Sequence, residues 1–286
     1  MSKLVTRSEI IGIIFAISAY LCFSLLDVIQ KTLIIYYSVF QILFLKYFFT
    51  FFLSFFESKR KKNVKFYQTN NLKLQLLRSL LSLLESGFFI LAFRYLSLAD
   101  AHSIGALTPI VVVVFSVIFL KEKISPKIWI VIFIGFFGVL VVMRPGLSVF
   151  DPMSLIPLAA AFFLGLYQIV TRKVSEYDKN ETSLFYSGIT GITLMGFMSL
   201  FFWESITINF FLLFIGVGIF YSFGVYFQII ALSKARASLI QPFHYTLIFW
   251  AIIFGYFFYG DIPDVFTIIG ALIIAISGIY IFKNYK

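Results

Sequence analysis

Ten long apolar segments fill this chain from end to end. Each is about as long as the roughly 20 residues that an α-helix needs to cross a hydrocarbon core of ~30 Å. Of the 286 residues, 61% are apolar and only 13% are charged, whereas about 25% of a soluble domain is charged. We therefore expect an all-α polytopic membrane protein with transmembrane helices at 10–30, 37–56, 75–95, 101–120, 127–143, 152–171, 183–202, 210–231, 238–258 and 265–282.

The distribution of basic residues tests this division. With a cytoplasmic N-terminus, nineteen of the 23 Lys and Arg residues fall on the cytoplasmic side, and only Lys31, Arg94 and Arg144 fall outside. Lys46 lies within a segment. Cytoplasmic loops carry an excess of Lys and Arg, and one segment more or fewer would destroy the separation. We expect ten helices in the inner (cytoplasmic) membrane, both termini cytoplasmic, and a first helix that is retained rather than cleaved as a signal peptide.

The second five segments weakly repeat the first five. Residues 96–101 (LSLADA) align with residues 232–237 (LSKARA), and each stretch precedes a polar patch with a proline, Pro109 or Pro242. Because five is odd, the two copies must enter the membrane in opposite orientations, which is typical of secondary transporters that work by alternating access. We expect two inverted five-helix repeats, 1–146 and 147–286, joined at Arg144-Pro145-Gly146.

Several short motifs resemble those of a known family. They are Asp27-x-x-x-Lys31, Phe44-Leu45-Lys46, Arg78, residues 95–101 (YLSLADA), Thr108-Pro109, residues 120–122 (LKE), residues 135–139 (GFFGV) and Arg144-Pro145-Gly146. Together they resemble the drug/metabolite transporter superfamily, in its ten-helix EamA branch. This sequence departs from the family pattern at Lys46, where Arg is usual, and at Gly260-Asp261, where the family has Gly-Glu.

The resemblance implies a carrier or exchanger of small organic metabolites, coupled to protons or another gradient. The Asp-x-x-x-Lys form of the first helix looks most like the subfamilies that take up riboflavin or S-adenosylmethionine. Export of amino acids or amphipathic drugs is the alternative that the resemblance leaves open.

Charged residues inside the predicted helices are candidate substrate or coupling residues, because each costs roughly 2.5–3.5 kcal/mol on insertion scales. Lys46 and Glu85 lie at similar mid-membrane depth in successive antiparallel helices. We expect them to approach each other or to share a polar cavity, for function or as a pair that only fixes packing. Asp27 and Lys31 are four residues apart and either form a local pair or line the outward mouth of the cavity.

Polar and aromatic residues in several helices of both halves extend this set. His244 follows Gln241 in the ninth predicted helix and could titrate near neutral pH or simply bond a neighbouring helix, whereas His102, near a helix end, is expected to face water. Binding sites in such folds lie near the midplane between the repeats, where a planar ligand could stack on Tyr or Trp; the alternative is ordinary helix packing. The remaining candidates are Tyr20, Ser24, Tyr167, Gln168, Tyr221, Tyr226, Gln228, Tyr245 and Trp250.

Other function classes find little support in the sequence. There is one cysteine, Cys22, and no Walker, HExxH or nucleophile-elbow motif, so we expect no cofactor and no bound metal. A membrane-embedded enzyme using Asp261 and Asp264 remains a further alternative, and a channel another. The basic run Lys59–Lys62 is expected to be a topology anchor near anionic lipids, not a nucleic-acid contact. The expected partners are a small-molecule substrate and the lipid bilayer, with protons as a candidate coupling ion, and the oligomeric state is left open.

Overall fold

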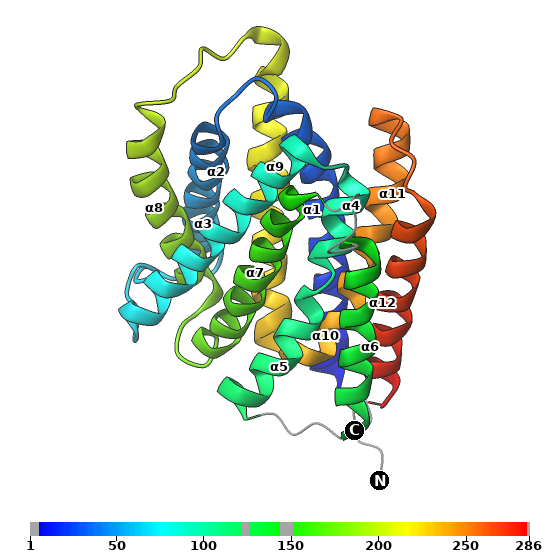
Figure 1. Ribbon diagram of the computed structural model, residues 1–286. Coiled ribbons are helices and arrows are strands. Elements are labelled where there is room, and N and C mark those ends of the chain that lie inside the picture. The colour runs from blue at the N-terminus through cyan, green and yellow to red at the C-terminus, as the bar shows by residue number, and fades with distance from the viewer. Residues whose placement is uncertain (1–5, 122–125, 144–150, 285–286) are drawn as a thin grey trace.

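A computed structural model describes residues 6–121, 126–143 and 151–284, and every regular element in these ranges is helical (Figure 1). The expected link at Arg144-Pro145-Gly146, and with it the boundary between the two repeats, lies outside the described residues. The elements are α1 (Arg7–Leu33), α2 (Val39–Arg60), α3 (Leu72–Tyr95), α4 (Leu98–Gly105), α5 (Thr108–Leu120), α6 (Pro126–Met143), η1 (Pro152–Ser154), α7 (Leu155–Val174), α8 (Asn180–Ser199), α9 (Ile208–Lys234), α10 (Ala237–His244), α11 (Thr246–Tyr259) and α12 (Val265–Asn284).

Within the described residues these elements make ten passes through the bundle, one for each expected transmembrane helix. Seven stretches are long and apolar enough to span a membrane: α1, α2, α3, α4–α5, η1–α7, α9 and α10–α11. The helices α6 and α12 contain shorter apolar stretches, Phe133–Val142 and Val265–Ser277. The remaining pass, α8, is 20 residues long and packs along α2. The all-helical, polytopic fold class is confirmed.

The two halves of the chain pack against each other in a symmetric pattern. Helix α1 packs along α9, and α3 packs along α7, so each of these pairs joins one half to the other. If each pass of the first half is exchanged with the pass at the same place in the second half, α1 becomes α7 and α9 becomes α3. The α1–α9 pair then becomes the α3–α7 pair. The same exchange maps α2–α8 and α6–α12 onto themselves, and these pairs form opposite sides of the bundle in Figure 1. This pairing is what two inverted five-helix repeats produce.

The fourth and ninth passes are broken at corresponding places. Ser97 caps α4 by accepting a hydrogen bond from the Asp100 backbone N–H, and α4 ends after eight residues. Pro109 lies in the first turn of α5, where its missing N–H leaves the Gly105 carbonyl without its usual helical donor. In the second half, α10 also has eight residues and stops at His244 before α11 begins. Such discontinuous helices often surround transporter binding sites.

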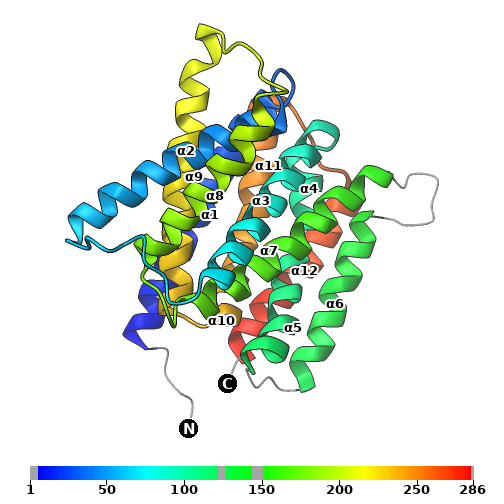
Figure 2. The same cartoon turned by 90° about the vertical axis from the view of Figure 1, so that its left-hand side faces the viewer.

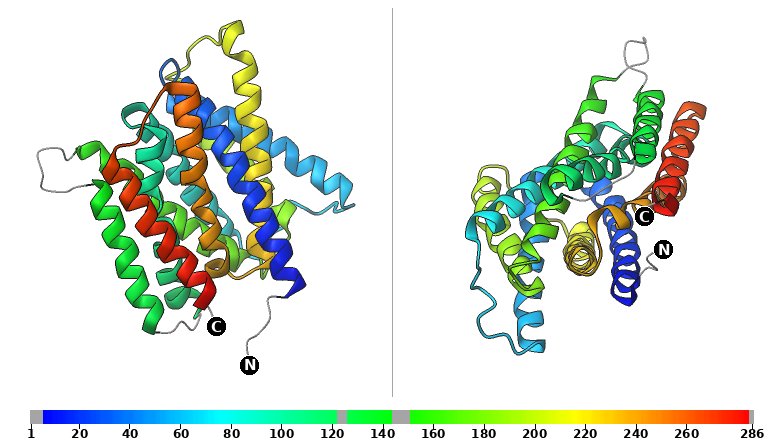
Figure 3. Two further views of the ribbon diagram at one scale, coloured as in Figure 1. Left: turned by 90° about the vertical axis from the view of Figure 1, so that its right-hand side faces the viewer. Right: turned by 90° about the horizontal axis from the view of Figure 1, so that it is seen from below.

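The two ends of the bundle differ in charge. Helix α1 begins and α12 ends at the same end, which Figure 3 shows from below. The connections at this end include the basic residues of the α2–α3 and α7–α8 loops. We call it the basic end. The opposite end carries the α1–α2 and α11–α12 connections, with Lys31 and Arg94 close by.

The α2–α8 pair depends on a close backbone approach at Gly188. A Cβ atom added to Gly188 would lie 2.6 Å from the Phe51 Cα and 2.7 Å from the Phe51 N. Real Cβ atoms do not tolerate such distances to backbone, so only glycine lets α8 lie this close to α2. Small residues therefore compensate here for the weak hydropathy of α8.

We expect Gly188→Ala to lower the melting temperature of the purified protein, with a loss of about 1–3 kcal/mol, because the added methyl group must push the two backbones apart. The matched control is Gly87→Ala in α3, where the added Cβ would lie 3.7 Å from Leu43. This control should be neutral or slightly stabilising, since alanine favours helix more than glycine does. Equal destabilisation by both substitutions would contradict the packing argument.

Candidate substrate cavity

A cavity of about 60 Å³, enough space for a few water molecules, lies between the two halves of the bundle. Helices from both halves contribute to its wall. Its polar and aromatic lining consists of Tyr20, Phe23, Asp27, Gln30, Lys46, Glu85, Ser86, Phe89, His102, Tyr167, Gln168, Tyr221, Gln228 and His244.

Lys46 and Glu85 lie on this same wall, on α2 and α3. The Lys46 side chain is almost completely buried, with 1% exposure, and its ammonium lies 4.1 Å from the centroid of the Tyr221 ring. The Glu85 carboxylate accepts a hydrogen bond of 2.8 Å from the Ser86 hydroxyl. The ion pairs of the described residues include none between Lys46 and Glu85. The two charges thus share a cavity without neutralising each other directly.

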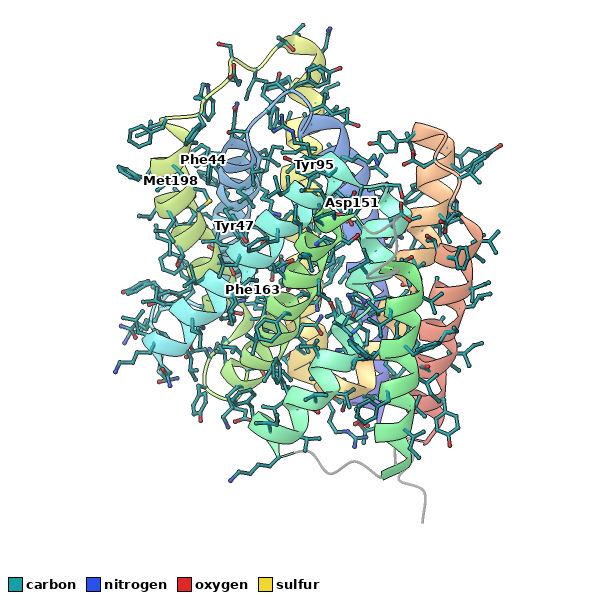
Figure 4. The ribbon with its side chains drawn as sticks, in the orientation of Figure 1. Phe44, Tyr47, Tyr95, Asp151, Phe163 and Met198 are labelled. Carbon is teal, nitrogen blue, oxygen red and sulfur yellow. The ribbon has the colours of Figure 1, made fainter. Side chains whose placement is uncertain are left out.

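Tyr47, labelled in Figure 4, supports the ring beneath Lys46. Its own ring meets Tyr221 edge-on with centroids 5.1 Å apart. The Tyr47 and Tyr221 hydroxyls each share a hydrogen bond of 3.1 Å with the Ser82 hydroxyl on α3. The hydroxyls of both tyrosines are therefore satisfied, and the face of Tyr221 is held in place for a cation.

Asp27 and His102 form the second charged group of the cavity wall. The His102 Nε2 lies 3.0 Å from the Asp27 Oδ2, which joins α1 to α4. The imidazole packs against the rings of Phe89 and Phe93, each at 5.8 Å between centroids.

The expectation that His102 faces water is wrong, since it is only 6% exposed. Helix α4 begins at Leu98, three residues before the segment drawn from the sequence, so His102 lies on its second turn, inside the bundle.

Lys31 lies outside the cavity, near the end of the bundle opposite the basic end. Its ammonium bonds to the Leu96 carbonyl at 3.0 Å and to the Asp261 carboxylate at 3.2 Å. Gly260, with φ 69°, ends α11 in the left-handed conformation that glycine favours, and the chain turns there just before Asp261. Asp27 and Lys31 therefore do not form the local pair considered above, because Asp27 bonds His102 on α4 and Lys31 bonds Asp261 in the α11–α12 connection.

His244 ends α10 and reaches the cavity beside Tyr20, whose ring it meets edge-on at 5.1 Å. Four buried polar atoms of the cavity lining have no hydrogen-bond partner among the described residues. Buried polar groups are almost always hydrogen-bonded, so these atoms are available to water or a ligand. They are Tyr20 Oη, Gln30 Nε2, Gln168 Nε2 and His244 Nε2.

The other candidate residues do not line the cavity. Gln241 donates a hydrogen bond of 2.8 Å to Gln168 Oε1 and so supports a lining residue from outside the cavity. Tyr245 packs in an apolar cluster with Ile248. The Ser24 hydroxyl bonds the Tyr20 carbonyl within α1.

Two further candidates belong to other parts of the bundle. Tyr226 donates to Glu57 and accepts from Arg60 at the basic end of the bundle. Trp250 stacks on Phe254, with ring centroids 5.6 Å apart.

Five polar or aromatic lining residues are not among the sequence candidates: Phe23, Gln30, Ser86, Phe89 and His102. Helical spacing could have identified three of them. Phe23 is four residues before Asp27, Gln30 is three residues after it, and Phe89 is four residues after Glu85, so each shares a helix face with a charged candidate. Ser86 and His102 carry no such signal, because their positions depend on the partner Glu85 and on where α4 begins.

The donor set of the cavity suits an organic ligand. Within the described part of the chain, no group of three or more His, Cys, Asp or Glu side chains could hold a metal ion. The wall instead combines separated charges, amides and ring faces, which can hold a polar molecule that also contains a flat ring system.

Comparison with known proteins agrees with this arrangement. The S-adenosylmethionine uptake transporter of Rickettsia conorii is 26% identical over 266 residues, which cover 91% of this chain and 88% of that protein. The riboflavin transporter of Vibrio cholerae is 27% identical over 175 residues, which cover 61% of this chain and 59% of that protein. A solved crystal structure shares the fold over 93% of this chain and 94% of its own, with a TM-score of 0.72 and 16% identity.

The sequence profile of the EamA-like transporter family matches residues 10–144 and again residues 152–283. These two matches cover nearly the whole chain and confirm the resemblance seen in the sequence motifs. The chain belongs to the EamA-like transporter family of the drug/metabolite transporter superfamily.

Proposed function

We propose that this protein is a secondary-active transporter that takes up a small zwitterionic metabolite by alternating access. S-adenosylmethionine is the first candidate substrate and riboflavin the second, since relatives carry both names. The observation that carries the preference is the charge of the cavity wall. One ammonium, Lys46, and two carboxylates, Asp27 and Glu85, line a single cavity between the halves.

The position of Lys46 supports binding of a substrate carboxylate. Its ammonium rests on the Tyr221 ring at 4.1 Å and forms no ion pair with another described residue. A cation–π contact is worth about 2 kcal/mol when desolvated, so an incoming carboxylate can replace or supplement it. Asp27 and Glu85 are left to face the positive groups of the same substrate.

S-adenosylmethionine matches this pattern group by group. It carries a carboxylate, an ammonium and a sulfonium, and its adenine can stack on a tyrosine or phenylalanine of the wall. Riboflavin has the flat ring system but no formal charge at neutral pH. For riboflavin, binding would rely on the amides Gln30, Gln168 and Gln228 and would leave three charges of the cavity unmatched.

The pseudo-symmetric packing supports the proposed mechanism. Residues from both halves of the chain line the cavity, and the broken passes α4–α5 and α10–α11 both reach it through His102 and His244. A rocking motion of the halves would expose it to either side of the membrane. The positive-inside rule supports an inner membrane location with the basic end in the cytoplasm.

Protons are the coupling ion that the cavity best accommodates. Glu85 is a buried carboxylate whose nearest hydrogen-bond partner is the neutral Ser86 hydroxyl, and Asp27 shares its charge with His102. Glu85 can therefore alternate between charged and neutral forms when substrate binds or leaves. Protonation of Glu85 would remove a charge that the membrane penalises, which makes it the preferred coupling acid.

We first expect S-adenosylmethionine to raise the melting temperature of the purified protein in a concentration-dependent manner, because a ligand that binds only the folded state stabilises it. S-adenosylhomocysteine, which lacks the sulfonium charge, should stabilise less at equal concentration. A shift with riboflavin and none with S-adenosylmethionine would contradict the zwitterion proposal.

Lys46→Met should weaken S-adenosylmethionine binding by about 10- to 100-fold, since hydrogen bonds to charged groups contribute about 1.5–3 kcal/mol. Binding should be measured by calorimetry in detergent. The control ligand is 5′-methylthioadenosine, which lacks the amino-acid carboxylate and should bind both proteins equally. If the variant loses both ligands equally, Lys46 does not bind the carboxylate.

Glu85→Gln should abolish accumulation of substrate driven by an acid-outside gradient in proteoliposomes, because the amide cannot carry a proton across. Exchange of labelled for unlabelled substrate without a gradient should persist, which shows that the variant folds and binds. Full gradient-driven accumulation with unchanged pH dependence would exclude Glu85 as the coupling acid.

A further inference from the structure

A second site lies at the basic end, where two connections meet. The α2–α3 loop and the α7–α8 loop lie near each other there (Figure 2). Side chains of both loops line an open cleft. Three lysines line this cleft: Lys62, Lys65 and Lys179. The amide side chains of Asn63 and Asn70 and the hydroxyl of Thr182 lie among them.

Two carboxylates, Asp178 in the cleft lining and Glu181 close to it in sequence, accept hydrogen bonds from other residues. Asp178 accepts hydrogen bonds of 2.8 Å from the Asn70 backbone N–H and from Gln75 Nε2, and another from the Thr69 hydroxyl. Glu181 accepts from Lys61 and Asn63, each at 2.9 Å. These bonds tie the α2–α3 loop to the second half of the chain.

The three cleft lysines outnumber Asp178, the carboxylate among the lining residues, so the cleft keeps an excess of positive charge. All three are exposed, and none takes part in an ion pair with another described residue. The backbone at Lys62 is held in the left-handed region, with φ 53°. The bonds Lys62 N to Lys59 O at 3.1 Å and Asn63 N to Ser58 O at 2.9 Å fix that turn. The cleft is thus a preformed positive site.

Exposed apolar side chains of the last turns of α2 and of the α2–α3 loop bear on which anion the cleft would bind. Phe55 and Phe56, on the last turns of α2, are 44% and 65% exposed, and Val64 and Tyr67 in the loop are 83% and 50% exposed. On a membrane protein such side chains face acyl chains or the headgroup boundary. A soluble phosphate would make no use of them, whereas a phospholipid would use both the lysines and the apolar surface.

We propose that this cleft binds the headgroup of an anionic phospholipid. Lys62, Lys65 and Lys179 bind the phosphate and headgroup oxygens, while Phe55 and Phe56 lie against the acyl chains. Basic residues at the cytoplasmic surface attract anionic lipids with about 1 kcal/mol each. The bound lipid joins the α2–α3 loop to the α7–α8 loop and so connects the two halves at this end.

Native mass spectrometry of the full-length protein in detergent tests the proposal. Phosphatidylglycerol should bind as a defined adduct, and phosphatidylcholine with the same acyl chains should not. The triple variant Lys62→Asn, Lys65→Gln, Lys179→Gln should weaken phosphatidylglycerol binding by roughly 100-fold, since each lysine contributes about a factor of five. Asparagine is chosen at position 62 because it tolerates positive φ.

The matched control removes three exposed lysines from the same end but outside the cleft: Lys59→Gln, Lys73→Gln and Lys234→Gln. It should retain binding, and both variants should melt at the wild-type temperature without lipid. Equal weakening by both triple variants would overturn the site in favour of general surface charge. Displacement of the lipid by millimolar inorganic phosphate, or absence of any selective adduct, would also overturn it.

Discussion

The membrane interior penalises unpaired charge, and the arrangement of the helices follows from where the few charges are placed. Lys46, Glu85 and Asp27 all lie within helices that cross the bundle, yet none faces the lipid side. Each charge costs several kcal/mol in hydrocarbon, so the helices that carry them must turn these faces inward. The three charges line the same cavity between the halves.

The halves meet through helix pairs that repeat under exchange of the two copies. Helix α1 packs along α9 as α3 packs along α7, so the helices that carry Asp27 and Glu85 both lie against the second half. The breaks after α4 and α10 then bring one histidine from each half to the same space. Polar chemistry at the centre is thus assembled from both copies, although the two copies share little sequence.

Much of the fold could be predicted from the sequence, because hydrocarbon thickness and the positive-inside rule act on every segment independently. All ten expected segments correspond to helical passes. The breaks were harder to predict, since α4–α5 reads as one apolar run and only Pro109 marks the interruption.

The site was predictable in its charges but not in its contacts. Glu85 and Lys46 stand out because charge is rare in a span, whereas the partner of Asp27 depends on how deep His102 lies. His102 lies deeper than expected because α4 begins at Leu98 rather than near residue 101. The partner of Lys31 could not be predicted either. Asp261 lies 230 residues away in sequence, and no local pattern connects the two residues.

In the proposed mechanism, the contact between Lys46 and the Tyr221 ring limits how tightly the substrate carboxylate can be held. The ring already stabilises the ammonium before a carboxylate binds. The binding free energy of the carboxylate is therefore reduced by whatever part of this ring contact is lost. When the substrate leaves, the ammonium regains the contact with the ring. It is therefore not left without a favourable partner after release. A transporter must release its substrate in every cycle. Competition from the Tyr221 ring would shorten the time for which the substrate stays bound, while Lys46 would still recognise the carboxylate.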